Sequence, residues 1–138
     1  MTLPTRNAQL RWTGDGLSFE GRTGKAPPVI LDGSSEAGPS PMEALLLSLG
    51  GCMGIDIQAI LDKGRVPLEG LEVDLEGVRA EDVPQRFTRI RIEVRVAGAG
   101  EENRAKVERA VQLSRDKYCS VFHSLRSDMP VEIDIQLD

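Results

Sequence analysis

Two thiols and one imidazole are the side chains best suited to covalent or metal chemistry in this sequence: Cys52, Cys119 and His123. A cysteine thiolate is a nucleophile, and two adjacent thiols can be oxidised to a disulfide. A closed zinc site usually takes four nitrogen or sulfur ligands, so we expect no metal and no cofactor. A permanent disulfide is not expected in a reducing compartment. Two alternatives follow, a pair of inert buried thiols or a redox-active pair.

The segment that carries Cys52 is predicted to be a long helix. Ser40-Pro41-Met42-Glu43 combines an N-cap serine, a proline at the first helical position and a glutamate three residues after the cap, which is a capping box. Apolar residues then occupy nearly every face until Lys63-Gly64 ends the helix. Gly50-Gly51 either reflects simple close packing of the helix or leaves space beside Cys52 for another backbone or a small ligand. Because a helix that is apolar all round must be buried all round, we expect a second subunit to cover it.

The rest of the chain predicts an α+β fold, as a single domain over residues 1–138. A hairpin is expected around the turn at 13–16, followed by a short apolar run at 29–31. Apolar and charged residues alternate in three later segments, which indicates antiparallel strands with one solvated face: 71–76, 89–96 and 131–138. A helix from Glu101 to about Tyr118 and a short helical turn from Cys119 to Arg126 are expected between the last two strands.

Charge and hydropathy narrow the class of protein. The 138 residues include 17 Lys and Arg against 22 Asp and Glu, a net charge of −5, which disfavours a nucleic-acid partner. No apolar run is expected to span a membrane, since Ser48 interrupts the richest one at Leu45–Leu49. The first thirty residues carry charged side chains, among them Arg6, Asp15 and Glu20, and no apolar signal region. We therefore expect a soluble, cytoplasmic protein with neither a membrane nor a nucleic acid as partner.

Two motifs together resemble the OsmC/Ohr family, in its OsmC-like branch with a Gly-Gly-Cys first motif. They are Ser40–Glu43 through Gly50–Asp56, and Lys117–Val121. The resemblance implies an OsmC-like fold, with antiparallel sheets around a long central helix, and an intertwined homodimer with two active sites at the subunit interface. Its best-known members reduce organic hydroperoxides. By analogy, Cys52 is the peroxidatic nucleophile, Cys119 resolves its sulfenic acid, and an external dithiol restores the pair.

Several residues are possible supports for this chemistry. The family's peroxidases hold the thiolate with a glutamate and an arginine, but Met42 occupies the glutamate position, and Glu43 follows it. Arg22 and Arg11 are both candidates for the arginine. Asp56 and His123 each lie four residues after a cysteine, and both keep a structural and a functional interpretation.

Because Met42 replaces the glutamate of the family's peroxidases, a second function stays open. It is a non-catalytic dimer that binds a small apolar molecule in the interface pocket beside the two glycines.

Overall fold

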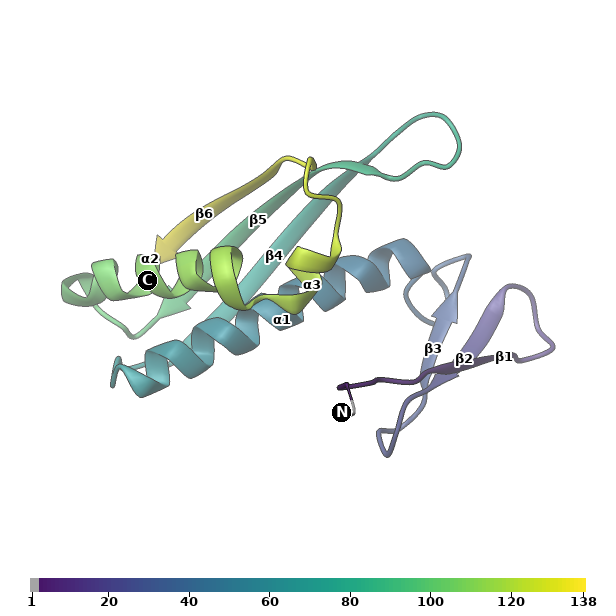
Figure 1. Cartoon of the computed structure of the whole chain (residues 1–138), viewed down its shortest axis with the longest axis horizontal. Coiled ribbons are helices and arrows are strands. Elements are labelled where there is room, and N and C mark those ends of the chain that lie inside the picture. Colours follow the sequence, from purple (N-terminus) through teal and green to yellow (C-terminus); the bar gives the residue numbers. More distant parts are fainter. Residues whose placement is uncertain (1–2) are drawn as a thin grey trace. The chain divides into compact units, whose positions relative to one another are not determined.

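A computed structural model describes residues 3–138, and the chain forms two compact units that divide after Leu45 (Figure 1). The long helix α1 (Pro41–Lys63) begins in the first unit and continues into the second. Its bounds confirm the predicted capping box and the predicted end at Lys63-Gly64. The expectation of a single domain over residues 1–138 stays a prediction.

The first unit contains a three-stranded antiparallel sheet of β1 (Gln9–Trp12), β2 (Ser18–Arg22) and β3 (Val29–Asp32). Gly14 and Gly16 in the β1–β2 turn have φ angles of 89° and 52°, a region that L side chains rarely adopt. The predicted hairpin is therefore confirmed. Large apolar side chains stay exposed in this unit, among them Leu10, Trp12, Leu17 and Val29.

The second unit contains a mixed sheet of β4 (Gly70–Arg79), β5 (Phe87–Ala97) and β6 (Val131–Leu137). Strands β4 and β5 are antiparallel, but β5 and β6 are parallel, so the expectation of antiparallel strands is wrong for β6. The physical reason is the helical connection between β5 and β6, which carries the chain back to the start of β5.

That connection contains four helical pieces. The turn η1 (Glu101–Asn103) leads into α2 (Arg104–Leu113), and a π-helical turn, η2 (Ser114–Tyr118), follows it. Cys119 then caps the short helix α3 (Ser120–Ser124). The predicted helix over 101–118 is confirmed as a whole, whereas the turn after Cys119 ends earlier than expected.

The core of the second unit lies between the sheet and the helices. Alternate residues of β5 have at most 1% of their surface exposed to solvent: Ile90, Ile92, Val94 and Val96. One stripe of α1 is buried to the same degree, at Leu49, Met53, Ile57 and Leu61, as is Val107 on α2. These positions match the period-2 and period-3.6 patterns of the sequence.

The opposite stripe of α1 is exposed in the single chain, with Leu47 64% and Ile55 71% accessible. The mean hydropathy of the helix reaches 1.8 over 18 residues, so by length and composition it could cross a membrane. The expectation that no segment is long and apolar enough to span a membrane is therefore wrong. The glycine and serine residues of α1 lower its mean hydropathy only slightly. Core helices of soluble proteins can have the same length and composition.

Candidate functional site

The two cysteines come together in the second unit, where the buried thiol of Cys119 meets the half-buried thiol of Cys52 on α1. An Asp56 carboxylate oxygen and the two sulfur atoms all lie within 4.8 Å of one another. Cys52 and Asp56 are four residues apart, which places them on one face of α1. These three groups form a cluster of two thiols and one carboxylate, which His123 does not join within residues 3–138.

Cys119 lies in surroundings that favour its neutral thiol. Its side chain has no solvent exposure, and burial raises its pKa from 9.0 to about 11. The neighbouring Cys52 thiol and Asp56 carboxylate act in the same direction. The Phe122 N–H, which donates to Sγ at 3.3 Å, acts against them. The sequence placed Cys119 correctly at the head of a short helix, but burial outweighs the hydrogen bond from Phe122 and favours the neutral thiol at neutral pH.

Ser114 connects the elements of this site, and the sequence analysis did not single it out. Its fully buried hydroxyl donates to Asp56 Oδ2 at 2.8 Å. Its carbonyl oxygen accepts the Cys119 N–H, also at 2.8 Å. The π-helical turn thus holds Asp56 and Cys119 through one residue, and π turns are frequent at functional sites. A serine on the apolar stripe of the predicted helix was the only available signal.

The other predicted supporting residues have separate partners. In the first unit, Arg22 forms an ion pair with Glu20 at 2.7 Å. Glu43 Oε1 accepts the Ser40 N–H at 2.8 Å and the Ser35 hydroxyl at 2.7 Å. These bonds, that from Ser35 above all, hold the pKa of the Glu43 carboxyl below its ordinary value. His123 is exposed, and its ring contacts Phe122 edge to face, at 5.4 Å between centroids.

Glu43 is expected to act on helix stability rather than on thiol chemistry. Glu43→Gln keeps an acceptor for the Ser40 N–H and should melt close to the parent, whereas Glu43→Ala should melt about 2–5 °C lower. Ser40→Ala is the matched control, because it removes the acceptor of the Glu43 N–H at 3.2 Å. Thermal unfolding and thiol oxidation by a hydroperoxide are measured on all three. A Gln variant that melts normally but oxidises ten times more slowly would place Glu43 in the active site.

An open apolar groove of about 500 Å³ runs between α1 and the first half of β4. It is lined by leucine, isoleucine and valine side chains around the glycines next to Cys52, among them Leu47, Ile55 and Val73. Nothing lies within 4 Å of the point where a Cβ on Gly51 would stand. At Gly50 the Cβ would instead approach Leu75 Cδ1 to 2.5 Å, so this glycine allows close packing of helix and sheet.

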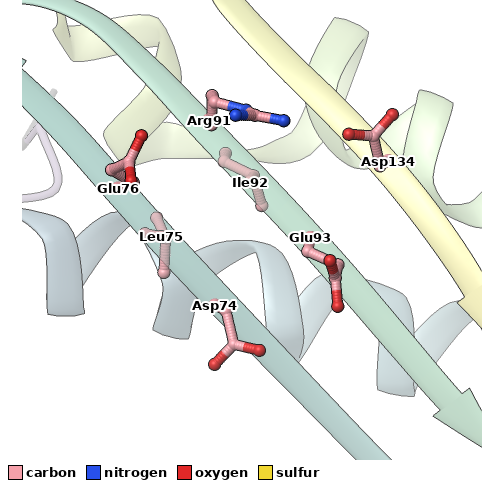
Figure 2. Close-up of a pocket in the computed structure, with 7 residues that line it drawn as sticks. All are labelled: Asp74, Leu75, Glu76, Arg91, Ile92, Glu93 and Asp134. Atoms are coloured by element: carbon pink, nitrogen blue, oxygen red, sulfur yellow. The ribbon is translucent and has the colours of Figure 1, made fainter.

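The other face of the second sheet is charged, as the alternation predicted (Figure 2). A shallow hollow of about 290 Å³ lies there, and three carboxylates cross it in register, from Asp74, Glu93 and Asp134. Arg95 bonds Asp74 at 2.8 Å and Glu72 at 2.7 Å. In Figure 2 the labelled charged side chains belong to the face of the sheet that is turned away from the helices, which are drawn behind the strands. Exposed ion pairs of this kind contribute little to stability, and they agree with a solvated face.

Comparisons with known proteins agree on the family. The profile of the OsmC-like protein family matches residues 32–134. Protein YhfA of Escherichia coli K12 is 42% identical over 115 residues, which are 83% of this chain and 84% of YhfA. A hypothetical protein from Aquifex aeolicus VF5 has 29% identity and a TM-score of 0.89, with 99% and 98% of the two chains covered.

A more distant structure shares the fold alone. It is an organic hydroperoxide resistance protein from Elizabethkingia anophelis, with 13% identity, a TM-score of 0.68 and 99% of each chain covered. The family profile and the YhfA relationship agree with the arrangement of two sheets and one long helix. The chain therefore belongs to the OsmC-like protein family.

Proposed function

We propose that this protein reduces organic hydroperoxides with Cys52 as the attacking thiol and Cys119 as the resolving thiol. The proposal rests on the short distance between the sulfur atoms of Cys52 and Cys119, which lie within 4.8 Å of each other. The two residues are more than sixty positions apart in the sequence. The OsmC/Ohr family includes hydroperoxide reductases, which supports the same chemistry. Cys52 is the attacking group in this proposal because it is partly accessible, whereas Cys119 is fully buried.

The proposed cycle has three steps. The Cys52 thiolate attacks the O–O bond, so that an S–O bond forms and the alkoxide leaves as an alcohol after it takes a proton. Cys119 then attacks the Cys52 sulfenic acid, and water leaves as the disulfide forms. An external dithiol finally reduces the disulfide by exchange.

Members of this family are typically homodimers, and we propose an intertwined homodimer here also. The exposed stripe of α1 and the apolar groove beside it favour a second copy as cover. Assignment to the Gly-Gly-Cys branch and a cytoplasmic location, where a dithiol reductant is available, are part of the proposal.

The groove also supports the second candidate function, which is the binding of a small apolar molecule without catalysis. Its open space at Gly51 and its aliphatic lining suit such a ligand. The two functions differ in what happens to the thiols, because a binding protein leaves both of them reduced.

The direct test is a rapid-quench experiment on the reduced protein with cumene hydroperoxide and, in parallel, hydrogen peroxide. We expect cumene hydroperoxide to consume two thiols per chain within seconds and to yield an equal amount of alcohol. We expect hydrogen peroxide to react at least ten times more slowly, in line with the organic hydroperoxide resistance protein that shares the fold. If neither peroxide consumes a thiol while an apolar dye binds the protein, the binding function is supported and the proposed enzyme is wrong.

A further inference from the structure

The Asp56 carboxylate lies beside both thiols of the proposed reaction, and the fold holds its position. It lies one helical turn after Cys52, with a carboxylate oxygen within 4.8 Å of both sulfur atoms. Its Oδ2 accepts the Ser114 hydroxyl, and the Ser114 side chain has no solvent exposure. A carboxylate beside two thiols repels their thiolate forms, so a purely structural role for it would work against the chemistry.

The resolving step contains a difficulty that this carboxylate can remove. Cys119 must lose its proton to attack the sulfenic acid, because the thiolate is the nucleophile. Burial and the neighbouring Cys52 and Asp56 groups raise the pKa of Cys119 to about 11, so its thiolate is scarce at neutral pH. Within residues 3–138, the ionisable groups that raise this pKa are Cys52 and Asp56, both on α1. A base beside the thiol therefore speeds this step at neutral pH.

Ser114 keeps such a base in place. Its hydroxyl fixes one carboxylate oxygen of Asp56, and its carbonyl fixes the backbone N–H of Cys119. The two groups are consequently held by the same π-helical turn. The Ser114 hydroxyl uses one acceptor site of the carboxylate, and the remaining sites can take a proton.

We propose that Asp56 relays the proton of Cys119 to the hydroxyl group that leaves the Cys52 sulfenic acid. This inference rests on the proposed function. In the step, the S–H bond of Cys119 breaks and its electron pair forms the S–S bond to Cys52. The S–O bond of the sulfenic acid breaks, and its oxygen leaves as water with the proton that Asp56 passes on. No further oxidant or reductant is required.

Asp56 could instead only repel the Cys119 thiolate. The two roles predict opposite changes in the rate of disulfide formation when Asp56 is replaced, so one variant distinguishes them. If Asp56 only repels the Cys119 thiolate, Asp56→Asn makes that thiolate more abundant and speeds disulfide formation. If Asp56 relays the proton, the same substitution slows disulfide formation, since asparagine cannot accept the proton.

The experiment follows the two steps separately by rapid quench with a sulfenic-acid reagent. In Asp56→Asn we expect sulfenic acid to form within threefold of the parent rate, and disulfide formation to slow at least tenfold. The disulfide rate of the parent should stay level from pH 6 to 8, whereas that of the variant should rise about tenfold per pH unit. Ser114→Ala, which keeps the carboxylate but frees it, should slow the same step by a smaller factor. Parent-like or faster disulfide formation in Asp56→Asn, or in Ser114→Ala if the first variant does not fold, overturns the relay.

A thiol reagent separates this inference from the proposed function. With 5,5′-dithiobis(2-nitrobenzoate), Cys52 releases one thionitrobenzoate, and the attack of Cys119 on the mixed disulfide releases a second. We expect Asp56→Asn to slow only the second release. That result, together with a parent that reacts with no peroxide, would refute the peroxidase while keeping the role of Asp56. A second release at the parent rate would refute the relay, whatever the peroxides do.

Discussion

Replacing Cys52 by serine is expected to abolish hydroperoxide reduction, with a loss on the order of a thousandfold in the rate of peroxide consumption. A serine hydroxyl is not ionised at neutral pH and is a far weaker nucleophile than a thiolate. Cys119 cannot take over, because it is buried and its pKa is about 11. Consumption of cumene hydroperoxide by the reduced variant, at equal protein concentration, is the measurement.

Cys119→Ser is the matched variant, since it changes the other thiol of the same pair by the same single atom. It should react once at close to the parent rate and then hold Cys52 as sulfenic acid, which excess peroxide oxidises to sulfinic acid. Intact-mass spectrometry distinguishes these products. If both variants lose the first oxidation step equally, the assignment of the two roles is wrong.

The long helix shows what the sequence determines locally. Ser40 and Glu43 are three residues apart, so the capping box and both of its hydrogen bonds could be predicted from neighbours in the chain. The helical period likewise places Leu49, Met53 and Ile57 on one stripe, although apolar residues on nearly every face did not single it out as the buried one. In each case the physical cause acts within one or two helical turns, and a single sequence contains it.

The candidate site depends on contacts that no local pattern specifies. The alternation in β6 predicts a strand but not its direction, and the helical connection makes it parallel to β5. Cys52 and Cys119 were paired through the resemblance, while the third member of their cluster, Asp56, was left with two interpretations. Ser114, 58 residues from its partner Asp56, looked like an ordinary member of a helix stripe. Long-range pairing of this kind becomes visible only when the fold is known.

The exposed stripe of α1 leads to the last prediction, which concerns the subunit interface. We expect the parent to sediment at about 30 kDa at micromolar concentration, twice the chain mass of 15.1 kDa. Ile55→Glu should weaken the dimer by roughly a hundredfold or more, because it would bury an unpaired charge at the interface. Ile55 is 71% exposed in the single chain and lines the groove, so within that chain the substitution removes no buried contact.

Val83→Glu provides the matched control for this experiment. Val83 is 91% exposed in the connection between β4 and β5, and it undergoes the same change from an aliphatic to a charged side chain. We expect this variant to stay dimeric, which would show that the position of the charge matters rather than its presence. A parent that sediments as a stably folded monomer would contradict the interface, as would an Ile55→Glu variant as dimeric as the control. The stripe would then need another cover, and the apolar ligand of the second candidate function would become the stronger explanation for the groove.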